Sequence, residues 1–207
     1  RLVLDCKYKS FLVKIMKKFA ILATLLISLS SFSAFAKTSG NYAGIDIIYS
    51  EVKLDQASTS SIGSGDQISV GVNYKYAFNF NNFFVAPGVF FDYTNIRAKA
   101  SNNDEWDLDF RYGAKVDLGY DITDKFAAFV NIGLANNHYD AKYIVSGTKT
   151  SDSKIEELYG IGVKYSATDD IDVGLSYEFS NLNVKDPLNN TVKFDLEVVR
   201  LGISYNF

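Results

Sequence analysis

The feature that most constrains this chain is a two-residue alternation of apolar and polar side chains, which recurs in eight separate stretches. Between Gln67 and Phe78, every second residue is Ile, Val, Tyr or Phe, and the residues between them are Ser, Gly, Asn, Lys and Ala. A period of two is that of a β-strand, whose side chains point alternately to opposite faces of a sheet. The pattern therefore predicts eight strands, each with one apolar and one polar face.

Glycine indicates which of the two faces is inside. The eight stretches contain ten glycines, and all ten fall on the polar face. A solvent-facing strand position has no use for glycine, which weakens a strand, whereas a closed barrel with a narrow lumen needs small residues inside. We therefore expect the polar face to line a lumen and the apolar face to contact lipid.

The stretches and the segments that connect them define a topology. The expected strands are residues 42–52, 67–78, 83–94, 106–120, 126–137, 155–166, 171–182 and 194–207. Short connections (79–82, 121–125 and 167–170) alternate with long ones (53–66, 95–105, 138–154 and 183–193). Each stretch can cross a membrane as a tilted strand of about 9–11 residues. The predicted fold class is all-β, an eight-stranded antiparallel up-and-down transmembrane β-barrel. Its long loops lie at the outer end and both termini at the periplasmic end.

The N-terminal region predicts export. Residues 16–36 begin with Met16 and two lysines, continue with an apolar run, and end in Ala34-Phe35-Ala36, which matches a signal-peptidase site. We expect cleavage there, with Lys37 as the first residue of a barrel domain over residues 37–207. Residues 1–15 fit no targeting pattern. They are interpreted as an upstream over-extension of the reading frame, or alternatively as part of an unusually long basic leader.

Charge and cysteine content exclude several classes of function. Of 21 basic and 24 acidic residues, the first 36 residues hold six and one, which leaves 15 and 23 and a net charge of −8. A nucleic-acid partner is not expected, because it would require a basic face. Cys6, the only cysteine, lies in the segment expected to be removed, so the remaining chain has no thiol chemistry. No His or carboxylate cluster shows the spacing of a metal site, and no metal or cofactor is expected.

Charged residues are frequent on the expected inner face. They are Asp46, Lys75, Asp92, Asp107, Asp109, Arg111, Lys115, Asp117, Glu156, Lys164, Asp172, Glu178 and Arg200. One interpretation is a conducting or catalytic constellation. The other, which we favour, is an ion-pair network that fills the lumen, because buried charges need partners and eight strands leave room only for side chains.

We assign six residues to that network: Asp92, Arg111, Lys115, Lys164, Glu178 and Arg200. Within it, Glu178 is expected directly opposite Arg200, across a hairpin centred near Leu188 and Asn189.

A few residues disturb the pattern. Pro87 lies in mid-strand, where we expect a bulge or a position that needs no N–H donor. Glu51, Glu157 and Glu197 fall on the lipid face near the loop end, where a charge costs less than at the bilayer midplane. Leu196 and Val198 share the inward parity of Arg200, so the last strand is expected to shift register or leave the membrane above Val199.

The C-terminus carries a family resemblance. Leu201, Ile203, Tyr205 and Phe207 alternate with smaller or polar residues up to the final aromatic residue. Together with the leader and eight strands, this resembles the small outer-membrane β-barrel family of Gram-negative bacteria, which includes opacity-protein-like surface proteins and the N-terminal barrel of outer membrane protein A. The resemblance implies that these four residues form the signal read by the barrel-assembly machinery. It also implies a barrel surrounded by outer-membrane lipid, which we expect to be monomeric.

The expected function is a structural or adhesion-type surface role, with host or environmental ligands contacting four extracellular loops. A narrow porin or ion channel is the main alternative. A lipid A-modifying enzyme is a distant third, because such chemistry needs a nucleophile beside a base. The single histidine, His138, lacks the His-x-Ser arrangement of lipid A deacylases and has Asp140 two residues on. We therefore expect no catalytic residues.

Overall fold

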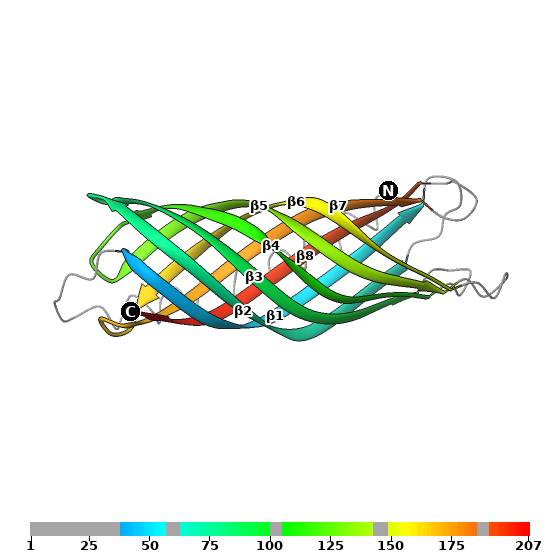
Figure 1. Cartoon of the computed structure of the whole chain (residues 1–207), viewed down its shortest axis with the longest axis horizontal. Helices are drawn as coiled ribbons and strands as arrows, with labels where there is room; N and C mark the ends of the chain where they lie inside the picture. Colours follow the sequence, from blue (N-terminus) through cyan, green and yellow to red (C-terminus); the bar gives the residue numbers. More distant parts are fainter. Residues whose placement is uncertain (1–37, 57–62, 100–104, 143–148, 186–190) are drawn as a thin grey trace, which may run out of the picture. The chain divides into compact units, whose positions relative to one another are not determined.

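A computed structural model describes residues 38–56, 63–99, 105–142, 149–185 and 191–207. The strands are β1 (Gly40–Gln56), β2 (Gly63–Phe80), β3 (Phe83–Lys99), β4 (Glu105–Asp121), β5 (Phe126–Lys142), β6 (Lys149–Ser166), β7 (Ile171–Lys185) and β8 (Thr191–Asn206). Each strand pairs antiparallel with its neighbours in sequence, and β1 pairs with β8, which closes the barrel (Figure 1). The predicted fold class is confirmed. The expected cleavage residues Ala34, Ala36 and Lys37 lie outside the described residues.

The strands are longer than the sequence indicated. They contain 15 to 18 residues each, and the backbone ladder continues into the segments expected to be long loops. The β5–β6 ladder, for example, runs on from His138 paired with Ser153 to Lys142 paired with Lys149. Polar sequence gave no strand signal there, because the ladder is held by backbone hydrogen bonds, which need no apolar face. Only 57–62, 100–104, 143–148 and 186–190 lie between strands at this end, and they are outside the described residues.

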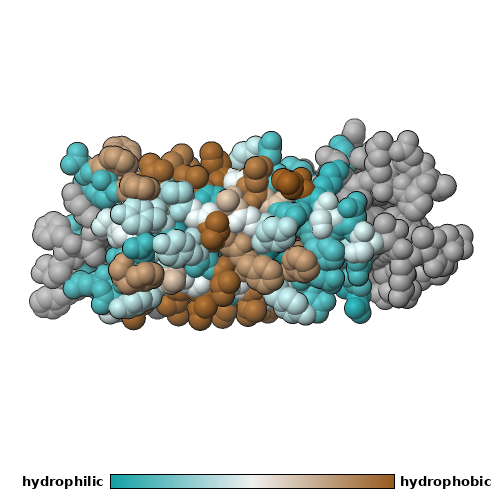
Figure 2. All heavy atoms as spheres, in the orientation of Figure 1, coloured by the Kyte–Doolittle hydropathy of each residue, from teal (hydrophilic) through white to brown (hydrophobic). Residues whose placement is uncertain are grey.

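The outer surface is apolar around the middle of the barrel. Figure 2 shows a band of hydrophobic side chains there, with more hydrophilic residues toward the end where β8 begins. Large apolar residues on the outward parity, such as Ile45, Val70 and Leu134, are more than half exposed. Since residues of this kind are exposed to water only at a cost, the band is the part of the barrel that lipid surrounds. Among the described residues, no helix is long and apolar enough to span a membrane.

A β-bulge in β4 corrects one part of the predicted pattern. The β4–β5 register shifts between Leu108 and Phe110, so that Asp109 is an extra residue. A bulge of this kind places two successive residues on one face. Asp107 and Asp109, expected inside, therefore lie on the outer face, and Leu108, expected outside, faces inward between buried Ile96 and Tyr139. A local alternation count cannot anticipate a slip of one residue.

Of two other irregularities expected from sequence, the one at Pro87 is confirmed in its second form. The β3–β4 ladder is continuous there, but the β2–β3 ladder skips Pro87 and Ala86, between Gly88 paired with Lys75 and Val85 paired with Phe78. Pro87 thus lies where β2 needs no N–H donor from β3. The β8 ladder runs unbroken through Leu196 and Val198 to both neighbouring strands. These two side chains are 4% and 1% exposed. The strand therefore does not change register there, and its inward apolar residues are buried in the lumen. That it leaves the membrane above Val199 stays a prediction.

Two of the three outward glutamates lie toward the loop end, as the pattern indicated, whereas Glu157 lies in the middle of β6 opposite Leu134. Glu51 and Glu197 are directly opposite each other on β1 and β8. The Lys53 ammonium lies 2.6 Å from a Glu197 carboxylate oxygen and 3.7 Å from one of Glu51. The hydroxyl of Tyr177 donates a hydrogen bond of 3.0 Å to Glu197. This cluster lies in the polar outer zone, where the carboxylates are partly exposed and have a lysine as partner.

Glycine at position 113 is required by close approach of two strands. A Cβ on Gly113 would overlap the carbonyl oxygen of Leu134 and lie 3.0 Å from the Cα of Ala135, both on β5. These are backbone atoms, which cannot move aside without opening the ladder. At Gly174, in contrast, an added Cβ would meet only the Val163 carbonyl oxygen, at 3.9 Å.

We therefore expect Gly113→Ala to destabilise the barrel by about 1–3 kcal/mol, the usual cost of overpacking. Urea unfolding in lipid vesicles, followed by tryptophan fluorescence, measures this free energy. Gly174→Ala is the matched control, and it should be neutral or slightly stabilising, because alanine in a strand loses less backbone entropy than glycine. Equal losses in the two variants would show that close strand approach is not the reason for Gly113.

Candidate functional site

The centre of the lumen holds a network of charged side chains around Arg200 on β8. The Arg200 guanidinium makes two hydrogen bonds of 2.9 Å with the two carboxylate oxygens of Asp92 on β3. It also donates one of 2.8 Å to Asp46 on β1 and lies 3.4 Å from a Glu178 oxygen on β7. A planar guanidinium suits such a two-point contact with a carboxylate. Arg200 thus joins β8 to strands on both sides of it and to β3 across the lumen.

Two further cations complete this set. Arg111 on β4 lies 3.0 Å from Asp92 and 3.4 Å from Glu178, and Lys115 forms an ion pair with Glu178. We call Asp46, Asp92, Arg111, Lys115, Glu178 and Arg200 the central network. It has three positive and three negative groups, and all except Lys115 have side chains at most 6% exposed. Balanced charge and multiple contacts are what make burial of ions tolerable.

Phe90 supplies an apolar surface beneath the cations. Its ring centroid lies 5.4 Å from the Arg111 guanidinium carbon, 5.6 Å from the Lys115 ammonium and 5.6 Å from the Arg200 guanidinium carbon. Cations within about 6 Å of an aromatic face are attracted by its quadrupole. Phe90 is 4% exposed, so the ring both fills the lumen and stabilises the cations. The alternation placed Phe90 inside but gave no sign of this role.

The contact between Glu178 and Arg200 is present, but it is diagonal. Strands β7 and β8 pair Glu178 with Val198 and Ser176 with Arg200. The register is therefore shifted by two residues from the expected one, in which Glu178 would pair with Arg200. This displaces Arg200 by two residues from the position opposite Glu178, which long side chains can span. Glu178 also has Lys115 and Arg111 as partners, so Asp92 is the main partner of Arg200.

A second charged layer lies nearer the turn end. Lys75 lies 3.0 Å from Asp117, and Lys164 lies 2.9 Å from Asp172. The Tyr42 ring lies between the two ammonium groups, at 5.9 Å and 5.2 Å. Lys164 was assigned to the same network as Arg200, but its ion pair belongs to this separate layer. The two layers lie at different heights along β7, which begins at Ile171. Asp172, the partner of Lys164, is its second residue, whereas Glu178 lies seven residues after Ile171.

The turn end is closed by polar contacts of Thr38. Its hydroxyl donates a 2.6 Å hydrogen bond to Asp121, and its backbone N–H donates one of 3.2 Å to the same carboxylate. The Asn79 amide also donates to Asp121, at 3.2 Å. Thr38 is 2% exposed, so this residue, two positions before β1, covers the base of the lumen.

On the loop side of the central network, the lumen contains an apolar layer. It is formed by Ile48, Val52, Leu158, Leu196 and Val198, all at most 4% exposed. Glu156 lies in the same part of the barrel, and its carboxylate accepts a 2.9 Å hydrogen bond from Ser180. Buried apolar side chains offer no hydrogen-bonding groups to an ion that has lost its water. Two of these residues, Leu196 and Val198, appeared in the sequence only as apolar exceptions on the inward parity.

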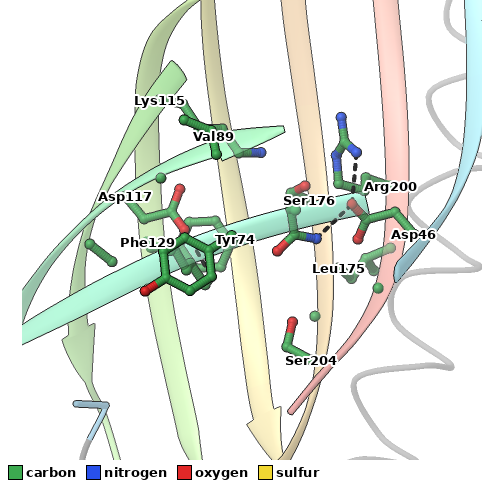
Figure 3. A pocket seen from close by; sticks show the side chains of 16 residues that line it. Asp46, Tyr74, Val89, Lys115, Asp117, Phe129, Leu175, Ser176, Arg200 and Ser204 are labelled. Carbon is green, nitrogen blue, oxygen red and sulfur yellow. Dashed lines mark hydrogen bonds and ion pairs between the residues drawn. The ribbon is translucent and has the colours of Figure 1, made fainter. Parts of the chain in front are cut away.

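A small cavity of about 60 Å³ lies between the two charged layers (Figure 3). Arg200 and Asp46 lie on one side of the view, and Lys115 and Asp117 on the other. Ser176 and Ser204 add hydroxyls to its lining. A polar cavity of this size has room for a few water molecules, but it is far below the roughly 300–1,000 Å³ of a typical ligand pocket.

The row expected to direct assembly lies on the outer face. The side chains of Leu201, Ile203, Tyr205 and Phe207 are 44%, 54%, 54% and 64% exposed. The rings of Tyr205 and Phe207 are stacked, with centroids 6.2 Å apart. The row is therefore available to lipid; its role as an assembly signal stays a prediction.

Comparisons with known proteins agree with this architecture. The profile of the family described as "Outer membrane protein beta-barrel domain" matches residues 20–207. Outer membrane protein A of Atlantibacter hermannii is 29% identical over 93 residues, which are 44% of this chain and 38% of that protein. Its Salmonella typhi counterpart is 30% identical over 93 residues, again 44% of this chain but 26% of that protein. The match thus covers much less than half of these relatives' length.

Solved structures show the same fold. Neisserial surface protein A superposes with a TM-score of 0.55 at 18% identity, covering 82% of this chain and 98% of that chain. Ail, the attachment invasion locus protein of Yersinia pestis, superposes with a TM-score of 0.51 at 18% identity, covering 81% and 99%. That crystal structure is a complex with the heparin analogue sucrose octasulfate. At this level of identity the likeness concerns the fold alone.

The contacts of Arg200 predict strong and coupled effects on stability. Arg200→Ala should destabilise the barrel by about 3–5 kcal/mol, because it leaves buried carboxylates without their partner. The double variant with Asp92→Asn should lose less than the sum of the single variants, and the coupling should exceed that of Arg200 with Glu178. Double-mutant cycles by urea unfolding in vesicles measure both couplings.

Arg97→Ala is the matched control for this prediction. Arg97 lies 2.8 Å from Asp107, but its side chain is 63% exposed. An exposed ion pair contributes only about 0–1 kcal/mol, so this variant should unfold nearly as the wild type does. Strict additivity of Arg200 and Asp92 would contradict the assignment of Asp92 as the main partner.

Proposed function

The chain belongs to the outer membrane protein β-barrel domain family and is therefore an integral outer-membrane protein, and on this premise we propose that it is a surface-exposed, adhesion-type barrel with a closed lumen. Its role is to hold the segments between strands at the cell surface, where they contact host or environmental ligands. A rigid scaffold that presents variable segments is a common way to build a binding surface.

The observation that carries the proposal is the series of side-chain contacts across the lumen. From the turn end upward, the lumen contains the Thr38–Asp121 contact, the layer around Tyr42, the central network and the apolar layer. A conducting pore would need a continuous wet path through all four. Breaking the central network would separate buried charges in a region of low dielectric, which is costly. This arrangement supports a scaffold in preference to a transporter.

The composition of the connecting segments supports a neutral ligand-binding surface. Residues 57–62, 100–104, 143–148 and 186–190 contain no Lys or Arg, two acidic residues, and many Ser, Thr and Asn. Hydroxyl and amide groups suit hydrogen bonding to neutral groups of proteins or sugars. Ail was crystallised with a sulfated heparin analogue. For this chain we propose ligands that bind through hydrogen bonds to these segments, with Lys99, Lys142, Lys149 and Lys185 at the flanking strand ends able to attract acidic groups of the ligand.

We also propose that the protein is not an enzyme. His138 is flanked by two hydroxyls, Ser153 Oγ at 3.0 Å from Nδ1 and Ser151 Oγ at 3.3 Å from Nε2. A nucleophile–base pair needs the second ring nitrogen to be oriented by a group such as a carboxylate. In the part of the chain that the structure describes, neither ring nitrogen of His138 hydrogen-bonds to a carboxylate. The arrangement therefore supports another role for this histidine.

A narrow channel is the second candidate function. It is favoured by the polar cavity between the charged layers, because water there could take part in ion passage if the apolar layer opened. The two candidates differ in one measurable quantity, which is the conductance of the folded barrel.

We expect the refolded barrel to give no stepwise conductance in planar lipid bilayers at about 100 mV in either polarity. The physical reason is that ions cannot cross the apolar layer or the central network without breaking buried contacts. Insertion is verified by heat-modifiable gel mobility of protein recovered from the same preparation, and a general porin serves as the positive control. Reproducible steps from the wild-type barrel would favour the channel.

Binding should depend on the segments between strands. Bacteria that display the barrel should adhere to a mammalian epithelial monolayer more than bacteria without it, and replacement of residues 143–148 by Gly and Ser should reduce adherence at least about threefold. Asn81→Gly is the control, since it lies in a turn at the other end with a φ of 63° that glycine accepts. The proposal is contradicted if the displayed wild type adds no adherence, or if both variants behave alike.

A further inference from the structure

We propose that Asp109, His138 and Asp140 form a binding site for a divalent transition metal of the Zn²⁺ class on the outer wall of the barrel. The ligand atoms of these three side chains all lie within 4.8 Å of one another. They come from β4 and β5, which are adjacent strands. The inference concerns a cation site and does not depend on whether the barrel is an adhesin or a channel.

Strand geometry accounts for two of the three ligands. His138 and Asp140 are two residues apart on β5, so both side chains point to the same face. That face is the outer one, because Asn137 and Tyr139, the residues that alternate with them, are 1% and 7% exposed. The sequence showed this spacing, but a His-x-Asp pair alone supplies too few ligands for a metal.

The bulge in β4 supplies the third ligand. His138 is paired with Phe110, and Asp109 is the extra residue next to that pair. In a regular strand Asp109 would point into the lumen, opposite to Phe110. Because the bulge inserts one residue, Asp109 turns to the outer face beside His138. Bulges commonly re-aim a side chain in this way near functional sites.

The imidazole is held in place from both sides. The His138 ring stacks on Phe110 with a centroid distance of 4.7 Å and an interplanar angle of 17°. Ser153 and Ser151, both on β6, lie 3.0 Å and 3.3 Å from its two nitrogens. When one nitrogen binds a metal, the other can donate its hydrogen to a serine hydroxyl. Such outer contacts orient a metal-binding histidine and set its tautomer.

The position of the cluster makes it accessible from water. Along the outward row of β5, Val130, Ile132 and Leu134 are about half exposed and apolar, and the row becomes polar at Asn136. Asp140 is exposed and the other two ligands are half-buried. The cluster therefore lies beyond the apolar band, where a cation can arrive without crossing lipid.

The ligand set indicates the class of metal. One imidazole with two carboxylates suits borderline cations such as Zn²⁺, whereas Ca²⁺ and Mg²⁺ prefer all-oxygen sets. Three protein ligands also leave a coordination position for water or an external oxygen ligand. We therefore expect Zn²⁺ to bind one to one and excess Ca²⁺ to compete poorly.

The test uses the tag-free full-length barrel, refolded in detergent micelles, with ¹⁵N-labelled histidine. Because the chain contains a single histidine, each ring nitrogen gives one assignable signal. Addition of one equivalent of ZnCl₂ should shift one nitrogen to the range of a metal-bound imidazole and leave the other as N–H. Unchanged ring signals up to about 100 µM Zn²⁺ would overturn the proposal.

Variants distinguish the site from diffuse attraction to acidic groups. His138→Gln, Asp109→Asn and Asp140→Asn should each weaken Zn²⁺ binding about tenfold or more by isothermal titration calorimetry. Asp107→Asn is the matched control, because it removes the same charge from the same face of β4, yet Asp107 pairs with Arg97 and is no member of the cluster. Heat-modifiable mobility verifies that each barrel is folded, and Asp109→Ser, which also removes the carboxylate, replaces Asp109→Asn if the latter does not fold. The proposal fails if Asp107→Asn weakens binding as much as Asp109→Asn, or if His138→Gln binds like the wild type.

Discussion

The rest of this structure depends on closure of the backbone ladder between β1 and β8. Hydrocarbon offers no hydrogen-bond partner to an exposed strand edge, so a sheet in lipid must close on itself. Closing eight strands fixes a lumen just wide enough for side chains. Every inward residue must then fit this volume, which is why Gly113 faces the β5 backbone and why Phe90 and Tyr42 fill the interior beside the lysines and arginines.

The narrow lumen also determines how charge is arranged. An arginine inside it is shielded from bulk water, so most of its donors must find carboxylates on other strands. Arg200 does so on three strands at once, with Asp46, Asp92 and Glu178. The central network therefore cross-links the barrel wall across the lumen. The same contacts that stabilise the fold support the proposal of a closed scaffold.

Beyond the apolar band, the barrel wall is under different constraints. The strands continue into polar sequence because the ladder itself is satisfied, and their outer face can carry charged and polar side chains. There the β4 bulge moves Asp109 to the outside beside His138 and Asp140. An irregularity that costs a ladder pairing thus creates the one His-carboxylate cluster found among the described residues. The segments between strands at the loop end and the outer wall of the barrel are therefore two separate candidate sites on one scaffold.

The sequence by itself determined the eight strands, their antiparallel order, and the face on which most residues lie, because a period of two is a local property of the chain. It could not determine where the strands end, because polar extensions pair through the backbone and leave no apolar signal. It placed Asp107, Leu108 and Asp109 on the wrong faces, since a single inserted residue reverses parity beyond it. Only the tertiary structure decided that Asp92 and Asp46 are the main partners of Arg200. It also decided that Lys164 belongs to a separate layer. Such contacts join strands far apart in sequence, and a register difference of two residues changes which charges meet.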